Sequence, residues 1–571
     1  MEPLPDHSVK NVLVLGGSYG GSHAAMVLAR KLPPTHRVIL IERNTHFNHL
    51  YVFPRYNIVP GHEHKAFIPY TSIFSDAPVR GRRLKNAASS GPDRVATQTK
   101  EDESASQARG DTHAIFMNVS ELISNNLHVG SAQAHKPTAT ADPNEQDVAS
   151  DPYAYAEPHL VVCGQVERIR DSYVTVKQNP SDSSAKHPLW SLDTIDIPYT
   201  HLVYALGSHM PDPLRHDTYT KKEGIAWMKV NQKRIDESRD IIIIGGGALG
   251  VEMATDIASQ YKKRGTPKNI TLIHSRQQLL PNFDVRIHEI AHKELLDLDV
   301  HVVLGHRLAT AEGCPLGSNI RQIANTSMAS DVPKDKMDAI ASAPRQRVRT
   351  TLGLELECDL LLMCTGQHPN SEIMAEFSPG SVNPDSRLVR VLPSLQVMLP
   401  SPEEAAPQPF SMVPPCIDCD CFLDKKSEGL HRTVGEGHSM PPHFKNVYAI
   451  GDVADAFGAL NAGYQAWFMA EVAAENILRD ILRVKSTKES DARPLAPTDT
   501  IPLESFKPGP PLLKLSIGLD KLVVQGAPEG DASAPGEPVR PTITMNAKPS
   551  EDLDPTLAWQ MALADTSDLH A

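Results

Sequence analysis

The fold of this chain is decided by two ten-residue stretches, VLVLGGSYGG at residues 12–21 and IIIIGGGALG at residues 241–250. Each opens with four apolar residues, as a strand buried on both faces requires, and closes with a glycine-rich turn. Each is followed by a segment of helical character and then by a second apolar strand, at residues 22–32 and 37–42 in the first unit and at about 251–263 and 269–274 in the second. The repeated order of strand, turn, helix and strand predicts an α/β protein with two Rossmann-type domains.

Both turns have the spacing G-x-G-x-x-G, which suits the pyrophosphate of a dinucleotide. The first glycine allows a tight turn, the second a close approach of the pyrophosphate, and the third the packing of helix on strand, while the helix N-terminus attracts negative charge. Gly245, Gly247 and Gly250 match in full. In the first turn Ser18 takes the middle position, where its hydroxyl can donate to phosphate. The candidate contacts of that turn are Gly16, Gly17, Ser18, Tyr19, Gly20 and Gly21.

The residues at the ends of the second strands predict which nucleotide each turn binds. Glu42, followed by Arg43, stands where a carboxylate accepts from the ribose hydroxyls of an adenosine, which suits FAD. The equivalent position of the second unit is His274, with Arg276 two residues later. No carboxylate repels a 2′-phosphate there, and Arg276 can pair with one, so we expect NADPH to be accepted at least as well as NADH. A solvated surface role for Arg276 is the alternative.

Three further short strands end in glycine, at residues 202–208, 359–366 and 447–452. With the two turns, their order resembles the pyridine nucleotide-disulfide oxidoreductase superfamily. That resemblance implies that Asp452, after Gly451, accepts from the ribityl chain of FAD. It also implies that the chain crosses from the FAD domain to the NAD(P) domain at Ala205 and Gly207 and returns at Gly366.

Within the superfamily the chain resembles the apoptosis-inducing-factor-like branch, the AMID or ferroptosis-suppressor proteins and their fungal relatives. Residues 47–55 are similar to that branch's Phe-x-His…Arg segment, which implies that Arg55 contacts the flavin nucleotide. Val166, in an expected strand over residues 160–169, matches the position whose backbone holds the adenine. Glu252 matches the acid of the NAD-site helix, so the resemblance makes it the candidate catalytic group beside the nicotinamide and flavin. An ordinary carboxylate on the helix face is the alternative.

The C-terminal part resembles this branch less closely. Residues 513–525 are similar to its C-terminal strand pair, whereas residues 552–559 are only loosely similar to its terminus. The family's terminal catalytic lysine is therefore not transferred, and Lys548 is the nearest candidate. We expect a small C-terminal α/β region that covers the flavin face.

The chain lacks the redox dithiol of the disulfide reductases. Neither C-x-x-C nor C-x4-C occurs near the first helix or in the expected NAD(P) domain, so the flavin must reduce the acceptor directly. The resemblance implies that this acceptor is a quinone or another electron carrier. Cys416, Cys419 and Cys421, with His431 and His438 nearby, have some zinc-ligand character, but they lie in a polar stretch without a second C-x-x-C, and no metal site is predicted.

Composition excludes several other classes of protein. The 571 residues carry a net charge of −13 without a basic stripe, which argues against a nucleic-acid partner. No apolar run is long enough to span a bilayer, and the first residues have neither a signal-peptide nor a transit pattern, so cytoplasm is the default expectation. Peripheral membrane contact, with mitochondrial or lipid-surface association, stays open, as does the oligomeric state. Two alternative functions also stay open, a redox-sensing interaction flavoprotein of the cell-death type and a type II NADH dehydrogenase.

These observations predict four regions. They are an FAD domain in two parts, residues 1–220 and 371–485, an NAD(P) domain at residues 221–370, and a partly disordered C-terminal region at residues 486–571. Five polar stretches without periodicity are expected to form loops or disorder, and the one at 399–442 is an insertion in the second FAD part. The stretches are roughly 79–112, 131–158, 309–346, 399–442 and 526–550.

Overall fold

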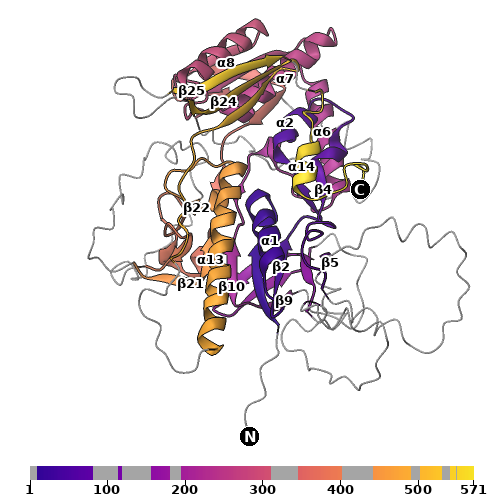
Figure 1. The fold of residues 1–571 in the computed structure, drawn as a ribbon. Coiled ribbons are helices and arrows are strands. Elements are labelled where there is room, and N and C mark those ends of the chain that lie inside the picture. The colour runs from indigo at the N-terminus through magenta and orange to yellow at the C-terminus, as the bar shows by residue number, and fades with distance from the viewer. Residues whose placement is uncertain are drawn as a thin grey trace, which may run out of the picture.

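A computed structural model describes most of the chain, and two parallel sheets organise it (Figure 1). The residues described are 9–80, 114–118, 153, 156–179, 194–309, 345–400, 441–489, 502–529, 540–547 and 550–571. Of residues 114–118, 212, 484–489, 529 and 547 only the backbone is described. The cysteine cluster at 416–421 and Lys548 lie outside the described residues.

The larger sheet has seven strands in the order β20-β21-β10-β1-β2-β6-β5. All neighbours are parallel except β20 and β21, as expected for strands fed by helical crossovers. Helices α1 and α13 pack side by side against it (Figure 1) and share its apolar core. The bounds are β1 Lys10–Leu15, β2 His36–Glu42, β5 Ala114–Asn118, β6 His159–Cys163, β10 His201–Tyr204, β20 Gln396–Met398, β21 His443–Ala449, α1 Tyr19–Lys31 and α13 Gly463–Glu489.

The smaller sheet has four parallel strands in the order β14-β13-β12-β17. The four consecutive isoleucines occupy its central strand β12, where a wholly apolar sequence is required because both faces are covered. The bounds are β12 Asp240–Ile244, β13 Asn269–His274, β14 His301–Leu304, β17 Leu360–Met363, α6 Lys221–Glu237, α7 Ala248–Lys263 and α8 Val285–Asp297, with a hairpin of β15 Gln346–Arg349 and β16 Glu355–Cys358 beside them.

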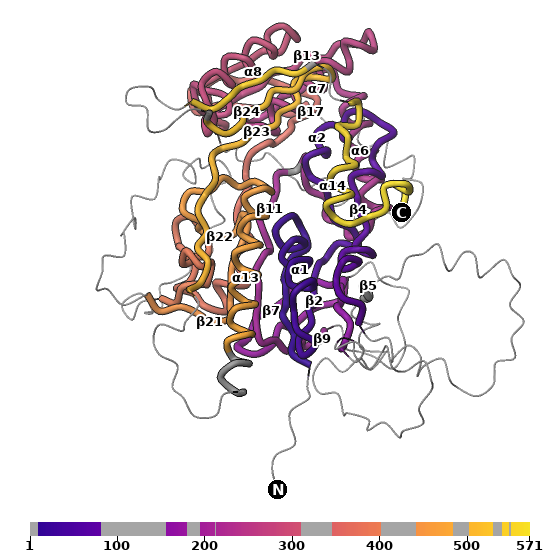
Figure 2. Tube along the Cα trace, in the orientation of Figure 1, coloured from indigo at the N-terminus to yellow at the C-terminus, as the bar shows by residue number. Residues whose placement is uncertain are grey.

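The chain passes between the two sheets at two adjacent crossings. Strand β11, Ser208–His209, leads out of the larger sheet, and β18, His368–Pro369, leads back to it. The two strands pair antiparallel. We call the part built on the larger sheet the larger body and the part built on the smaller sheet the smaller body. Figure 2 shows β11 between these two bodies. Strands β20 and β21 return to the larger sheet after β18, so that sheet is assembled from two separate parts of the sequence. The predicted α/β class with two Rossmann-type units is confirmed.

The C-terminal residues divide between the two bodies. Strands β23, β24 and β25 form an antiparallel sheet on α7, and Leu515 and Ile517 belong to the apolar core of the smaller body. Helix α14 lies beside the larger body (Figure 1), where Trp559 is fully buried in the other core. The bounds are β23 Leu513–Ile517, β24 Lys521–Glu529, β25 Arg540–Ala547 and α14 Thr556–Met561.

Short elements complete the fold around the site. They are β3 His46–Asn48, η1 Leu50–Val52, α2 Phe53–Tyr56, η2 Glu63–Ala66, β4 Phe67–Pro69, η5 Asp212–Leu214, α11 Glu372–Phe377, η6 Pro379–Ser381, β19 Val389–Arg390, η7 Gly451–Val453 and β22 Ala454–Asp455. A three-stranded antiparallel sheet consists of β7 Gln165–Ile169, β8 Tyr173–Lys177 and β9 Thr194–Pro198.

Two expectations about secondary structure are wrong. The single strand expected over residues 160–169 is two strands, because Gly164 separates β6 of the parallel sheet from β7 of the antiparallel one. The polar stretch 526–550 contains the end of β24 and the whole of β25. In β25 the apolar Ile543 and Met545 alternate with polar residues, which is the period of a strand with one face exposed.

Candidate functional site

The first glycine turn is built by close backbone packing. Gly16 has φ +94°, and a Cβ there would lie 2.4 Å from the carbonyl oxygen of Ala205. A Cβ on Gly21 would lie 1.8 Å from the carbonyl oxygen of Gly16. No side chain fits at either place, so α1 approaches β1 closely and its N-terminus opens at Tyr19. Ser18 is the N-cap residue, and its hydroxyl makes no capping hydrogen bond.

Glu42 is fixed beside this turn at the end of β2. Its Oε2 accepts from the backbone N–H of Gly17 at 2.5 Å, and its Oε1 accepts from the backbone and side-chain amides of Asn44, both at 2.9 Å. Asn44 Oδ1 is buried and bonds to no other described residue, so a polar ligand group has an acceptor waiting there. The glycine turn, the carboxylate of Glu42 and the unpaired Oδ1 of Asn44 together fit the adenosine and pyrophosphate of FAD.

The second glycine turn repeats the first with a different partner. Gly245 has φ +116°, and a Cβ on Gly250 would lie 1.8 Å from its carbonyl oxygen. Here the N–H of Gly246 donates to His274 Nδ1 at 3.1 Å, and His274 Nε2 lies 3.1 Å from the carbonyl oxygen of Gln278. An imidazole that accepts at Nδ1 and donates at Nε2 is neutral. His274 therefore takes the place that Glu42 has in the first turn without contributing a negative charge.

Two arginines lie near this second turn. Arg276 and Arg307 line the same cavity, and the backbone of the two loops is joined by hydrogen bonds from Gly305 N to Arg276 O and from His306 N to His274 O, both 3.0 Å. Arg307 was not found from the sequence because it follows β14, and helix α8 and strand β14 separate it from Arg276 along the chain. The absence of a carboxylate at His274 and the presence of two cationic side chains fit a phosphorylated ribose.

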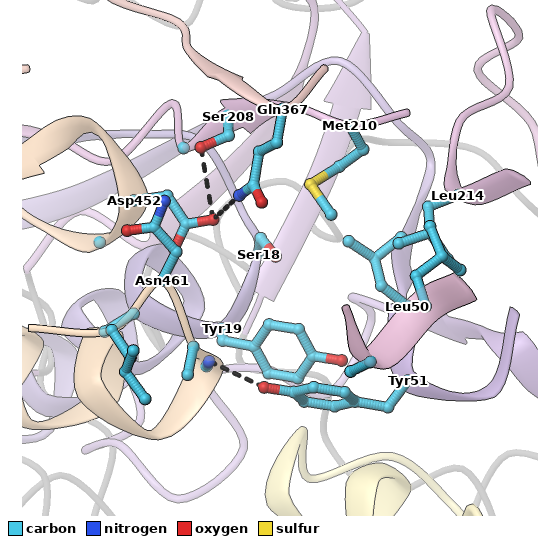
Figure 3. Close-up of a pocket in the computed structure, with 18 of the residues that line it drawn as sticks. Ser18, Tyr19, Leu50, Tyr51, Ser208, Met210, Leu214, Gln367, Asp452 and Asn461 are labelled. Atoms are coloured by element: carbon cyan, nitrogen blue, oxygen red, sulfur yellow. Dashed lines mark hydrogen bonds between the residues drawn. The ribbon is translucent and has the colours of Figure 1, made fainter. Parts of the chain in front are cut away.

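Asp452 lies where the crossovers meet the larger body. Its Oδ2 accepts from Ser208 Oγ at 3.4 Å and from Gln367 Nε2 at 3.0 Å, so one residue from each crossing holds it (Figure 3). Burial raises the pKa of Asp452 to about 6, so the carboxylate is mostly ionised at pH 7. Both donors use Oδ2, and Oδ1 stays available to a ligand hydroxyl. Sequence reasoning missed Ser208 and Gln367, which lie 244 and 85 residues from Asp452.

The crossovers themselves are rigidly joined. Asn370 donates from its backbone N–H to the carbonyl oxygen of Gly207 at 3.0 Å and from its side chain to that of Leu206 at 2.9 Å. Gly207 and Gly366 both have positive φ, +63° and +93°, where glycine is the favoured residue. These bonds fix the distance between the two nucleotide sites.

Glu252, on α7, has an unusual environment. Its Oε1 accepts from both the backbone N–H and the hydroxyl of Ser516 at 3.2 Å, and the nearby carboxylate of Asp256 lies one turn further along the helix. Burial first, and the Asp256 charge second, raise the pKa of Glu252 to about 8. Glu252 is therefore mostly a neutral acid at pH 7, and it lines the cavity.

Arg55 does not lie where the resemblance placed it. It is fully buried outside the cavity lining, and its guanidinium binds Asp256 with two hydrogen bonds of 2.7 and 3.1 Å. It also donates to the carbonyl oxygens of Gly518 at 2.9 Å and Glu551 at 3.3 Å. All of these hydrogen bonds go to protein atoms, and they join α2 to α7, to the β23–β24 turn and to Glu551.

One cavity of about 3580 Å³ connects both turns. A pocket for one drug-sized ligand measures about 300–1,000 Å³, so this cavity has room for two dinucleotides and a further small molecule. Of the predicted site residues, Gly17, Gly250 and Arg55 do not line it. Those that do are Gly16, Ser18, Tyr19, Gly20, Gly21, Glu42, Arg43, Val166, Ala205, Gly207, Gly245, Gly247, Glu252, His274, Arg276, Gly366, Gly451 and Asp452.

Apolar and aromatic side chains surround one part of this cavity. Tyr19 and Tyr51 lie ring to ring at 5.2 Å, and Leu50, Met210 and Leu214 lie nearby (Figure 3). Lys514, on β23, also lines the cavity and was not found from the sequence. Several lining residues expose large apolar surfaces, namely Tyr51, Phe468, Leu512, Leu557 and Met561.

Disulfides, metal sites and membrane-spanning helices were also considered for the described residues. Cys163, Cys358 and Cys364 carry no disulfide. Among the described residues, no three His, Cys, Asp or Glu side chains gather closely enough to hold a metal ion. Nor does any helix in these residues combine the length and the apolar character needed to cross a bilayer.

Comparison with known proteins agrees with this geometry. Residues 10–389 match the family model of pyridine nucleotide-disulphide oxidoreductases. Fe-regulated protein 8 of Mycosarcoma maydis is 32% identical over 533 residues, which cover 91% of this chain and 90% of that protein. Human ferroptosis suppressor protein 1 is 27% identical over 328 residues, 56% of this chain and 63% of that protein. Apoptosis-inducing factor homolog B of Dictyostelium discoideum is 22% identical over 341 residues, 59% and 69% of the two chains.

Solved structures are matched more distantly. The NAD-dependent persulfide reductase of A. fulgidus shares 14% identity at a TM-score of 0.45, covering 91% of this chain and 64% of that one. The family match spans more than half of the chain, and the first relative aligns over nearly all of it. This chain therefore belongs to the pyridine nucleotide-disulphide oxidoreductase family, as a flavoprotein oxidoreductase with FAD- and NAD(P)-binding domains of the Rossmann type and with relatives among the ferroptosis suppressor and apoptosis-inducing factor proteins.

Proposed function

We propose that this chain takes electrons from NAD(P)H onto FAD and passes them directly to a quinone-class acceptor, without a redox disulfide. The observation that carries the proposal is the single cavity in which both glycine turns, Asp452 and Glu252 meet. Bound FAD would accept a hydride from the nicotinamide and return two electrons to the acceptor. The chain's own contribution is to hold both nucleotides in register and to supply a proton.

Each part of the FAD site has a distinct task in this proposal. The N-terminus of α1 and the Gly16–Gly21 turn hold the pyrophosphate, and Glu42 holds the adenosine ribose. Val166 and Arg43 line the cavity towards the adenine end, and Asp452 accepts from the ribityl chain through its unused Oδ1. The domain bounds that we propose from the two sheets are those expected from the sequence, with the crossings at β11 and β18 as the joints.

NAD(P)H is placed by the second turn. The Gly245–Gly250 turn and the N-terminus of α7 hold its pyrophosphate, and Arg276 and Arg307 favour a 2′-phosphate on its ribose. The nicotinamide then lies towards the crossovers, where Gly366 and Glu252 line the cavity. We therefore propose that NADPH is used at least as well as NADH.

Proton balance gives Glu252 its role. Reducing a quinone to a hydroquinone takes two electrons and two protons, and a hydride equivalent brings both electrons and one proton. The second proton comes from Glu252, which is mostly protonated at pH 7 and regains its proton from solvent after each turnover. The exposed apolar side chains of Phe468, Leu557 and Met561 around the cavity favour an acceptor with an apolar body.

The test is a spectrum of the purified full chain. We expect flavin absorbance that bleaches under anaerobic NADPH and returns when a soluble naphthoquinone is added, with one quinone consumed per NADPH. The variant Glu252→Gln should still bleach with NADPH but reoxidise slowly. A protein that binds no flavin when reconstituted with FAD, or whose reduced flavin is not reoxidised by any quinone, contradicts the proposal.

A further inference from the structure

Four segments of the chain meet at the buried pair of Arg55 and Asp256. Both side chains have no exposed surface. Arg55 comes from α2, Asp256 from α7, and the other two partners of Arg55 are carbonyl oxygens of Gly518, in the turn between β23 and β24, and Glu551. The guanidinium therefore ties the FAD body to the NAD(P) body and to the C-terminal residues. Removing either charge would leave the other buried without its partner.

Glu252 lies one helical turn before Asp256. Residues four apart lie on the same face of a helix, so the two carboxyl groups are neighbours. If both were ionised, their negative charges would repel each other. Burial raises the pKa of Asp256, and the two hydrogen bonds from Arg55 oppose that rise by favouring the ionised carboxylate. Among the described residues, the hydrogen bonds to Glu252 come from Ser516 and no cation is bonded to it, while the charge of Arg55 acts on it only from a distance. Of the two acids, Asp256 keeps the charge and Glu252 keeps the proton.

Ser516 decides which oxygen of Glu252 carries that proton. Its backbone N–H and its hydroxyl both donate to Oε1 at 3.2 Å. An oxygen that accepts two hydrogen bonds is favoured as the carbonyl oxygen of a carboxylic acid, so the acid proton lies on Oε2. β23 is held against α7 by the apolar core of the smaller body, which fixes Ser516 relative to Glu252.

We propose that Asp256, held by Arg55, and Ser516 are positioning residues that act through Glu252, the first keeping it protonated and the second fixing the oxygen that delivers the proton. The proposal rests on the proposed function. The other groups that face Glu252 do not replace these two. Tyr51 is a phenol and is therefore uncharged at pH 7, and Lys514, which lines the same cavity on β23, makes no hydrogen bond to Glu252.

The two substitutions should shift the pH at which Glu252 loses its proton in opposite directions, and this distinguishes the two roles. Ser516→Ala removes a hydrogen bond to the Glu252 carboxylate and should raise the pH at which Glu252 loses its proton. Asp256→Asn removes a negative charge and should lower it. Each shift should be on the order of one pH unit, the size expected for one charge-assisted hydrogen bond or one nearby charge. Since Ser516→Ala keeps every buried charge paired, it remains informative if Asp256→Asn does not fold.

Ser259→Ala is the matched control. Ser259 lies on α7, as Glu252 does, and its hydroxyl accepts from the backbone N–H of Leu519 in the β23–β24 turn at 3.4 Å, but no hydrogen bond links it to Glu252. The readouts are the infrared band of the protonated carboxyl group, which Glu252→Gln should remove, and the pH profile of flavin reoxidation by a soluble naphthoquinone. In the wild type, both should titrate near pH 8, with reoxidation slowing as the pH rises.

The outcomes separate the two proposals. A band midpoint that rises in Ser516→Ala and stays unchanged in Ser259→Ala supports the positioning roles. Identical midpoints in wild type, Ser516→Ala and Asp256→Asn would overturn them, even with full quinone turnover. A wild type without quinone turnover would refute the proposed function, but its infrared titration would still decide the roles of Ser516 and Asp256.

Discussion

The third glycine of each turn is the residue with the least freedom to change. At Gly21 the added Cβ would meet a backbone oxygen, which cannot rotate away as a flexible side chain would. We expect Gly21→Ala to lose bound flavin and to destabilise the fold by about 1–3 kcal/mol, the usual cost of overpacking a core. The ratio of flavin to protein absorbance and a urea titration measure both effects.

Gly247→Ala is the control for that change. No atom lies within 4 Å of a Cβ built on Gly247, and its φ of −80° suits any residue. This variant should fold with its full complement of flavin. A Gly21→Ala protein that also kept all its flavin would show that the close packing of α1 on β1 is not needed for the site.

Our proposal assigns the choice between the nicotinamide cofactors to Arg276 and Arg307 near the second turn. If Arg276 and Arg307 bind a 2′-phosphate, Arg276→Ala or Arg307→Ala should raise the KM for NADPH by roughly 10- to 100-fold, the equivalent of one charge-assisted hydrogen bond. The KM for NADH should hardly change, because NADH has no such phosphate. Steady-state kinetics with both cofactors measure the difference.

An arginine on the same body serves as the control. Arg264 caps the far end of α7, where it pairs with Asp236 on the surface. Arg264→Ala should leave both KM values as they are. Equal losses for NADH and NADPH in the Arg276 variant would assign that side chain a general role in binding or in folding, and the cofactor preference would have to come from elsewhere.

At the scale of elements, α14 is attached to the larger body through Trp559 and smaller apolar contacts. Trp559 is fully buried and donates from its indole N–H to the carbonyl oxygen of Lys65 at 3.0 Å, while Leu557 and Met561 of the same helix face the cavity. Trp559→Ala should cost about 3–5 kcal/mol locally, which exceeds what a six-residue helix can recover by itself. We expect α14 to detach and quinone turnover to fall, with reduction by NADPH retained.

Hydrogen exchange of the C-terminal peptides, together with rapid-mixing kinetics of the two half-reactions, measures this effect. Gln560→Ala is the control for packing, since that side chain is exposed on the same helix and lies outside the cavity lining. Slow exchange of α14 in Trp559→Ala would mean that other contacts, such as the ion pair of Lys65 and Asp552, suffice to hold the segment.

Whether the sequence could predict a site residue depended on how far apart along the chain its contacts lie. The two turns, Glu42 and His274 were found because each unit is local, within about thirty residues. Ser208, Gln367 and Ser516 were missed because they reach the site only through the crossovers and the C-terminal sheet, and no local pattern marks them. The partner of Arg55 could not be foreseen for the same reason, since Asp256 lies 201 residues away.

At the scale of the whole molecule, two bodies are held around one cavity. The paired crossings β11 and β18, the Arg55–Asp256 pair and the packing of β23–β25 on α7 all join segments that are remote in sequence. Such a frame keeps both nucleotides at a fixed separation, which hydride transfer requires. The electrons then have to leave from the flavin or through a thiol pair, and the two routes make different demands on the chain.

The direct route predicts that cysteines are dispensable. Cys163 lies at the end of β6, where its thiol donates to the carbonyl oxygen of Arg43, and Cys358 is fully buried in β16, so both are packed as small core residues. Cys364 is the cysteine that lines the cavity in the described residues, and none of the three is in a disulfide. We expect the triple alanine variant of Cys163, Cys358 and Cys364 to bind flavin and to reduce a quinone at a rate of the same order as the wild type.

A second variant completes this test, because Cys416, Cys419 and Cys421 lie outside the described residues. Replacing these three by serine should also leave turnover unchanged if no dithiol takes part. A dithiol on the route would give a specific signature: NADPH would still bleach the flavin in the affected variant, but the wild type would take up four electrons per flavin and the variant two. Anaerobic titration with NADPH counts those electrons. Uptake of two electrons by all three proteins, with equal quinone turnover, is the outcome that direct transfer from the flavin demands.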